Sequence, residues 1–373
     1  MMIKRINLGL IALFAVSVLT YAAAAQSEVV RRQVDATVAK RMSETGTPGM
    51  AVAVISKGNV VHSKGYGLAN VELGAPVTRD SVFNLASITK TFTALAVLKL
   101  AEQGRLSIDD PISKYFDQLP DTWRLITVRQ LINNTSGIRS FSSLTEPPCN
   151  AGADPRQYKR GDAIKEVTCY PLEFAPGERW KYGDTGFYLA GMLIERLTGM
   201  KYEAYLESNV PEPIGMKNTR LINYDEVIPN RVSGYNLRNG QLINAPRMEF
   251  DEFSNGGLMS SLTDMIRFEQ AFLTNRVLNR SSIDSMLANV KLNKGEPVVQ
   301  YGLGIGLTPY KGERRFGHTG GGGFGFGTAF THFPDHEVTV IVLANADQED
   351  IGTFANSIAE IFFTRNSSQE SNK

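Results

Sequence analysis

A serine and a lysine three residues apart are the first candidates for chemistry in this chain. Ser87 is followed by Lys90 at the start of a run of helix-forming residues, 91–100. On a helix, residues i and i+3 share a face with Cβ atoms about 5–6 Å apart, so this hydroxyl and this amine can hydrogen bond. A serine hydroxyl needs a base beside it to act as a nucleophile, and desolvation helps a lysine to lose its proton. The pair predicts an acyl-transfer site, although a plain helix N-cap also explains Ser87.

A tyrosine on a predicted loop is the second candidate. Pro176 and Gly177 predict a turn that places Tyr182 on a loop, and Asp184 follows two residues later. A phenolate beside an ammonium group can accept and return protons, so Tyr182 can relay protons to and from Ser87. Core packing of Tyr182 and an ordinary turn role for Asp184 are the alternatives.

A glycine-rich stretch late in the chain completes the set. His318, Thr319 and Gly320 open a run of glycines, 320–323, ahead of a predicted strand. Glycines let backbone N–H groups approach a ligand closely. Such an N–H, paired with that of Ser87, would form an oxyanion hole in which each donor contributes about 3–4 kcal/mol. A β-bulge is the simpler explanation of the glycines, and the two roles are compatible.

The order S-x-x-K, Y-x-[ND], H-x-G resembles the serine β-lactamase and penicillin-binding-protein superfamily. More narrowly, the chain is similar to the class C-like branch of DD-peptidases, D-aminopeptidases, esterases and related hydrolases. Further matching segments extend the resemblance over residues 30–364; they are 109–115, 128–138, 213–219, 256–268 and 341–346.

The resemblance implies a role for each motif residue. Ser87 would be acylated, Lys90 would help to deprotonate it, and Tyr182 would shuttle the proton to the leaving group and later activate water. His318 and Thr319 would contact the substrate or the Tyr182 hydroxyl. The N–H of Gly321, next to Gly320, would be the second oxyanion donor. The resemblance implies no metal and no organic cofactor.

Three positions depart from the family pattern. Asp184 stands where asparagine is common, and a carboxylate only accepts hydrogen bonds. Asp184 either leaves a substrate carbonyl without the N–H donor that an asparagine would supply, or it holds Lys90 protonated. In the second case, the role of the base moves toward Tyr182. His318 replaces the lysine of true class C β-lactamases, and a mostly neutral imidazole holds a β-lactam carboxylate less well, which favours peptides or esters. Asn134 replaces a frequent histidine at a position that we interpret as structural.

The expected elements form an α+β fold. The patterns predict a helix over 29–43, a hairpin of strands 50–55 and 60–66, a helical middle region over about 130–265, strands at 301–307, 327–330 and 338–343, and a last helix over 353–363. Strands at both ends predict an antiparallel sheet flanked by helices, plus an inserted mainly helical lobe, as in the β-lactamase/transpeptidase fold. The cleft between sheet and lobe is the expected place for the site.

The two ends of the chain predict export and a polar tail. Lys4 and Arg5 precede an apolar stretch, 8–21, and small residues that end at Ala25, so residues 1–25 are interpreted as a signal peptide. An uncleaved anchor is the alternative. Residues 26–364 would form the hydrolase domain, periplasmic or extracellular, and residues 365–373 a disordered tail.

Charge and cysteine content limit the partners. Without residues 1–25 the chain has 37 Lys and Arg against 38 Asp and Glu, which gives no reason to expect nucleic acid or strong membrane association. The histidines at 332 and 336 are expected in exposed turns. Cys149 and Cys169 either form a disulfide, worth about 3 kcal/mol in an oxidising compartment, or stay free thiols.

These observations favour an exported serine hydrolase with a covalent acyl-enzyme on Ser87. Its substrates would be small peptides, including those with D-residues or from peptidoglycan, or short esters; the oligomeric state stays open. A D-alanyl-D-alanine carboxypeptidase or weak β-lactamase is the alternative enzyme. A catalytically silent module that binds peptidoglycan or a protein is the alternative from another class.

Overall fold

The computed structural model describes residues 28–144, 149, 159–246, 253–295, 297–298, 301–347 and 350–363 of the 373-residue chain. The predicted signal peptide, 1–25, and the predicted tail, 365–373, lie outside the described residues and stay predictions. No helix within the described ranges is long and apolar enough to cross a membrane.

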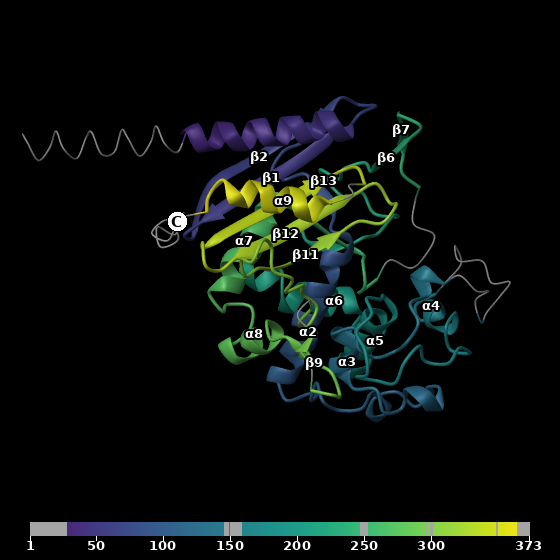
Figure 1. Ribbon diagram of the computed structural model, residues 1–373. Helices are drawn as coiled ribbons and strands as arrows, with labels where there is room; N and C mark the ends of the chain where they lie inside the picture. The colour runs from purple at the N-terminus through teal and green to yellow at the C-terminus, as the bar shows by residue number, and fades with distance from the viewer. Residues whose placement is uncertain are drawn as a thin grey trace, which may run out of the picture.

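The centre of the molecule is a six-stranded antiparallel sheet (Figure 1). Its strands, in spatial order, are β11 (Phe316–Gly320), β12 (Gly327–Phe333), β13 (Val338–Ala344), β1 (Gly49–Ser56), β2 (Asn59–Asn70) and β3 (Ala75–Pro76). The predicted hairpin is β1 with β2, and β1 also pairs with β13 so that Ala53 faces Ile341. The sheet therefore joins the two ends of the domain, which confirms the antiparallel sheet expected from the sequence.

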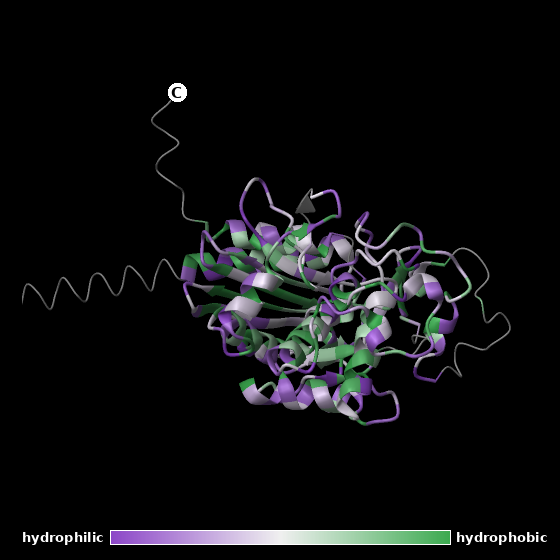
Figure 2. Cartoon of the chain, turned by 90° about the horizontal axis from the view of Figure 1, so that it is seen from below, coloured by the Kyte–Doolittle hydropathy of each residue, from purple (hydrophilic) through white to green (hydrophobic). Residues whose placement is uncertain are grey.

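Helices cover both faces of this sheet, which explains why β1 and β13 are apolar at nearly every position. Successive strand residues point to opposite faces. Val52 and Val54 of β1 accordingly pack with the helix over residues 28–45 and with α9 (Ile351–Glu360), while Ala53 packs with α7 (Leu262–Leu273) and the larger core. Figure 2 shows the hydrophobic strands inside and hydrophilic residues on the outer helices.

The helical lobe packs beside the sheet around α2 (Thr89–Glu102), whose residues are buried through most of its length. Its other helices are α3 (Val128–Ile132), α4 (Asp162–Lys165), α5 (Thr185–Thr198), α6 (Tyr202–Asn209) and α8 (Arg280–Met286). The described residues also form three small antiparallel sheets. In one, β8 (Leu258–Ser261) pairs with β4 (Val82–Asn84) and with β5 (Arg220–Leu221). The other two are β6 (Tyr235–Arg238) with β7 (Gln241–Asn244), and β9 (Val290–Lys291) with β10 (Pro297–Val298). This arrangement confirms the α+β fold with a helical lobe.

The predicted strand at 301–307 is wrong. Tyr301 and Gly306 form only isolated bridges, and the chain between them turns back so that Gly302 N–H donates to Ile305 O at 2.8 Å. Gly304 has φ +67°, and a Cβ there would lie 2.7 Å from Lys90 O on α2. Glycine allows this conformation and close approach, so the segment packs as a loop against α2. The strands predicted at 327–330 and 338–343 are confirmed as β12 and β13.

The structure also decides the predictions for the two cysteines and for two of the histidines. Cys149 and Cys169 form a disulfide with Cα atoms 5.6 Å apart, which settles the two alternatives. The exposed turn position expected for His332 is wrong, because this residue lies on a strand and is buried; His336 does lie in a turn, but its side chain is buried as well. His332 lies on β12 with Nδ1 2.8 Å from Thr339 Oγ1, and His336 stacks on Phe363 with ring centroids 4.0 Å apart.

Candidate active site

Ser87 and Lys90 lie together at the N-terminus of α2. Ser87 sits in a short 3₁₀ turn, Ala86–Ile88, and Lys90 in the first turn of α2, with Lys90 Nζ 3.1 Å from Ser87 Oγ. Ala86 has φ +46°, and its N–H donates to Asn84 Oδ1 at 2.7 Å. A non-glycine residue in this conformation is strained, so the surroundings hold the turn in place.

Lys90 is fully buried, and three acceptors surround its ammonium group. They are Ser87 Oγ at 3.1 Å, Asn255 O at 2.7 Å and Asp184 Oδ1 at 2.5 Å. Burial lowers the pKa of Lys90, but the charges of Asp184 and Tyr182 outweigh it and leave the pKa raised. An ammonium has three donors and no acceptor. Lys90 is therefore a cation with every N–H used, and it has no lone pair for the Ser87 proton.

Asp184 is the counter-ion of this lysine. Its side chain is 18% exposed, and Oδ2 accepts a hydrogen bond from the Ser142 hydroxyl. Burial raises the pKa of Asp184, but the Lys90 charge and hydrogen bonds from Lys90, Ser142 and Asn255 leave the pKa below its ordinary value. Of the two roles weighed for Asp184, the geometry favours the one that keeps Lys90 protonated.

Tyr182 stands beside this ion pair on the loop before α5. Its side chain is 39% exposed, and Lys90 Nζ lies 4.9 Å from the centroid of its ring. Asn134 holds the loop on both sides of Tyr182: its O accepts from Lys181 N–H at 3.0 Å, and its Oδ1 accepts from Gly183 N–H at 3.3 Å. Asn134 has φ +63°, a conformation that asparagine tolerates. The position is thus structural, as interpreted from the sequence, but it acts on the site itself.

His318 lies on β11 and is neutral. Its Nδ1 is 2.6 Å from Thr319 O and must carry the proton, so Nε2 accepts from the Tyr301 hydroxyl at 2.9 Å. Burial and the nearby Lys90 lower the pKa of His318 to about 4. Neither ring nitrogen bonds Tyr182, although the two rings lie side by side with centroids 6.1 Å apart, and the alternative expectation of a contact with the substrate stays a prediction. The local sequence pattern around Tyr301 predicts only a strand and gives no signal that its hydroxyl belongs to the site.

Gly320 brings β11 against the turn that carries Ser87. A Cβ at this position would lie 2.3 Å from Leu85 O and 3.0 Å from Ala86 Cβ, so only glycine permits this approach. Gly321 follows directly at the end of the strand. This packing supports the predicted oxyanion hole, with the N–H groups of Ser87 and Gly321 as donors.

The predicted site residues meet in a cleft of about 510 Å³, within the size range of ligand sites. It is lined by Ser87, Trp180, Tyr182, Tyr301, Gly306, Thr308, Arg315, Gly317, His318, Thr319, Gly320 and Gly321. Lys90 contacts Ser87 and the Tyr182 ring although it is not part of this lining, and Asp184 pairs with Lys90. No group of three His, Cys, Asp or Glu side chains suited to a metal occurs among the described residues.

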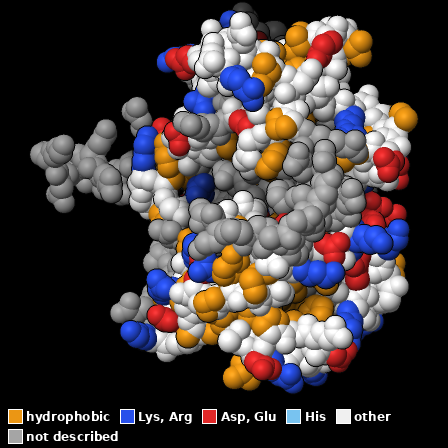
Figure 3. Space-filling view, turned by 90° about the vertical axis from the view of Figure 1, so that its right-hand side faces the viewer, with side chains coloured by type: hydrophobic (Ala, Val, Ile, Leu, Met, Phe, Trp, Pro, Cys, Tyr) orange, Lys and Arg blue, Asp and Glu red, His pale blue; other side chains and the backbone are white. Residues whose placement is uncertain are grey.

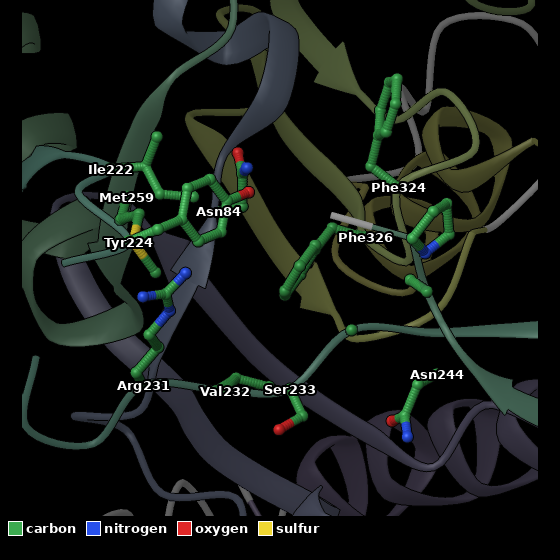
Figure 4. A pocket seen from close by; sticks show the side chains of 13 residues that line it. Asn84, Ile222, Tyr224, Arg231, Val232, Ser233, Asn244, Met259, Phe324 and Phe326 are labelled. Atoms are coloured by element: carbon green, nitrogen blue, oxygen red, sulfur yellow. The ribbon is translucent and has the colours of Figure 1, made fainter. Parts of the chain in front are cut away.

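A second pocket of about 380 Å³ begins where the glycine-rich turn leaves β11 (Figure 4). Phe324 and Phe326 line this pocket and not the Ser87 cleft, which has Trp180 as an aromatic wall instead. The cation of this pocket is Arg231, whose guanidinium carbon lies 4.9 Å from the centroid of the Tyr224 ring.

On the face of the molecule that Figure 3 shows, acidic and basic side chains are intermixed, and neither sign forms a patch of its own.

Known proteins with similar sequences identify the family of this chain. A sequence model of the β-lactamase family matches residues 34–358. Penicillin-binding protein 4* of Bacillus subtilis is 28% identical over 313 residues, 78% of this chain and 67% of that protein. Protein flp of Staphylococcus aureus (strain MW2) is 25% identical over 272 residues, 72% of this chain and 54% of flp, so the chain spans about half of its length.

Solved structures agree with the fold. The octameric penicillin-binding protein homologue from Pyrococcus abyssi is similar with a TM-score of 0.75 and 28% identity, over 88% of this chain and 76% of that one. A D-stereospecific amidohydrolase from Streptomyces sp. gives a TM-score of 0.70 and 26% identity, over 90% of this chain and 97% of that one. The motifs, their geometry and these similarities lead to one conclusion: the chain belongs to the β-lactamase family.

Proposed function

We propose that this protein is an exported serine hydrolase that cleaves amide or ester bonds through an acyl-enzyme on Ser87. Its substrates are small peptides, those with D-residues among them, or short esters. The observation that carries the proposal is Ser87 Oγ placed 3.1 Å from a buried Lys90 whose charge Asp184 balances. The similarity to a D-stereospecific amidohydrolase supports the substrate class.

The occupied N–H groups of Lys90 support the proposal that Tyr182 is the base. Tyr182, as a phenolate beside the Lys90 ammonium, accepts the Ser87 proton while Oγ attacks the substrate carbonyl. The N–H groups of Ser87 and Gly321 stabilise the oxyanion that forms. Tyr182 then donates the proton to the leaving group, and the C–N or C–O bond breaks.

Hydrolysis of the acyl-enzyme uses the same residues in reverse. Tyr182, again a phenolate, takes a proton from water, and the hydroxide attacks the acyl carbonyl in the oxyanion hole. The proton returns to Ser87 Oγ as the ester bond breaks. Lys90 stays an ammonium throughout and stabilises each negatively charged state of Tyr182.

Intact mass after exposure to a fluorophosphonate tests the proposal. We expect an adduct on Ser87, no adduct on Ser87→Ala, and turnover of a chromogenic ester that rises on the alkaline side. A parallel exposure to penicillin separates the enzyme classes: an adduct favours a DD-peptidase, and its absence favours an amidase or esterase. No Ser87 adduct with either reagent on folded protein would overturn the proposal in favour of a silent binding module. The intact mass of the mature protein also tests export, because removal of residues 1–25 would leave a chain that begins at Gln26.

A further inference from the structure

We infer that the pocket lined by Arg231, Phe324 and Phe326 binds a small aryl carboxylate as a second ligand, separate from any substrate at Ser87. This pocket of about 380 Å³ shares no lining residue with the cleft that holds Ser87. The inference goes beyond the proposed function, because it involves none of the residues to which that function assigns a chemical step.

The turn that carries the two phenylalanines is packed tightly against the two ends of the β6–β7 hairpin. A Cβ on Gly325 would lie 2.4 Å from Ala245 Cβ, and a Cβ on Gly234 would lie 2.7 Å from Phe326 Cε2. Gly325 also has φ +76°, a conformation that favours glycine. This close packing holds the turn that presents Phe324 and Phe326 to the pocket before any ligand enters.

Two turns lie between this pocket and the Ser87 cleft. The first leads from Gly321 in the cleft lining to Phe326 in the pocket lining, and a Cβ on Gly321 would lie 3.3 Å from Phe326 O. The second leads from Asn84, which lines the pocket, to Ser87, and Asn84 Oδ1 accepts from Ala86 N–H at 2.7 Å. The pocket and the cleft therefore adjoin, but a ligand in one leaves the lining of the other free.

Arg231 is the only charged side chain among the described residues that line the pocket. Its guanidinium carbon lies 4.9 Å from the centroid of the Tyr224 ring, and its Nη1 donates to Asn223 O at 3.4 Å. It forms no ion pair with a carboxylate within the described ranges. An arginine has five N–H donors in a planar fork, and a carboxylate accepts two of them in parallel. One singly charged anion matches this one cation, whereas a doubly charged phosphate would bring a second charge that the lining does not balance.

The rest of the lining suits an aryl group. Tyr224, Phe324 and Phe326 supply aromatic rings, which pack well against another ring edge to face or offset. Figure 4 shows Arg231 and Tyr224 on one side of the pocket and the two phenylalanines on the other. A ligand between them would place its carboxylate at Arg231 and its ring against the phenyl walls. The volume lies within the range of small-ligand sites.

A matched pair of compounds, 3-phenylpropionate and its amide, tests the inference, because they have similar size and differ in the charge of one group. Calorimetry measures the binding of each to the parent protein, to Arg231→Gln and to Arg231→Lys. Arg315→Gln removes the cation of the Ser87 cleft, and Arg238→Gln removes an exposed arginine outside both linings, so these two variants are the controls. Phe324→Leu removes one ring of the pocket.

We expect the acid to bind about 10-fold more tightly than the amide, since a bidentate contact with arginine adds charge-assisted hydrogen bonds. Arg231→Gln should abolish this preference, Arg231→Lys should keep part of it, and both controls should keep all of it. Phe324→Leu should weaken acid and amide alike by about three- to tenfold, which tests the pocket even if Arg231→Gln does not fold.

Two results would overturn the inference. One is that folded parent protein does not bind the acid at millimolar concentration. The other is that the preference for the acid is kept in Arg231→Gln and lost in Arg315→Gln, which would place the acid in the Ser87 cleft. Neither result bears on the proposed function, which the Ser87 adduct tests separately.

Discussion

Asp184 Oδ1 lies 2.5 Å from Lys90 Nζ, and this buried ion pair keeps the lysine a cation. The carboxylate holds the pKa of the lysine above its ordinary value in surroundings that would otherwise lower it. An asparagine at position 184 would leave the same space filled without the charge. In the proposed mechanism, the identity of this one residue therefore moves proton transfer from Lys90 to Tyr182.

Asp184→Asn should raise peptide turnover near neutral pH. Without the carboxylate, burial lowers the pKa of Lys90, so the lysine can take the Ser87 proton and the amide can donate to a substrate carbonyl. The alkaline rise of kcat/KM should move to lower pH, which a pH profile from 5 to 10 would detect. Unchanged or lower turnover on every substrate would contradict this account; exposed Asp225→Asn serves as the charge-matched control.

Tyr182→Phe should lower kcat/KM by about 10²–10⁴-fold, the usual contribution of a general base. The side chain is partly exposed and the phenyl ring is kept, so the free energy of unfolding should fall by no more than about 1 kcal/mol, the usual value of one hydrogen bond. Steady-state kinetics and denaturant unfolding measure the two effects. Tyr310→Phe, outside the cleft lining, should alter neither; full activity in Tyr182→Phe would rule out the proposed base.

Acid should destabilise the fold through its buried histidines. Burial lowers the pKa of His318 and of His332 to about 4, against 6.5 for an ordinary histidine, so the unfolded chain binds protons first as pH falls. Each histidine should therefore contribute about 3 kcal/mol that is present above pH 6.5 and lost on the way to pH 4.

The His332→Asn variant isolates one of these contributions. Denaturant unfolding at pH 7 and pH 4.5 should show a smaller loss of stability in the variant than in the parent, although the variant is less stable at pH 7. An equal loss in both proteins would mean that His332 does not contribute to the pH dependence. Since this residue lies outside the cleft lining, Ser87 labelling at pH 7 should not change.

Removing the disulfide should destabilise the fold without changing the reactivity of Ser87. Replacement of Cys149 and Cys169 by serine should lower the free energy of unfolding by about 3 kcal/mol, since the bond closes a loop with a sequence separation of 20. Denaturant titration measures this loss, and Ser87 labelling of the folded variant should match the parent. A variant as stable as the parent would show that the loop is ordered without the bond.

Asn134→Gly should disturb the position of Tyr182. Glycine keeps the positive φ but removes the Oδ1 acceptor of Gly183 N–H, so the loop loses one of its two anchors. We expect about 10-fold lower kcat with KM little changed, because small displacements of a catalytic group are costly. Restoration by Asn134→Asp, which retains an acceptor oxygen, would separate positioning from a general loss of stability.

The sequence alone determined the parts of this protein that depend on local pattern and spacing. Consecutive apolar residues at 50–55 and 338–343 predicted buried strands, because only strands covered on both faces are apolar at nearly every position. The i, i+3 spacing of Ser87 and Lys90 predicted their contact, because the helical repeat places both side chains on one face. The ordered motifs with Tyr182 and His318 predicted the family and hence the fold.

The three-dimensional fold brings together charged and polar groups that no local pattern relates. The ion pair of Lys90 with Asp184 joins residues far apart in the chain, and the bond from Tyr301 to His318 involves a segment without a local pattern. The loop at 301–307 shows the reason clearly: its apolar and glycine residues suit a strand by local pattern, but packing against α2 selects a conformation that only glycine permits. Protonation states follow from such long-range contacts and burial, which no local spacing contains.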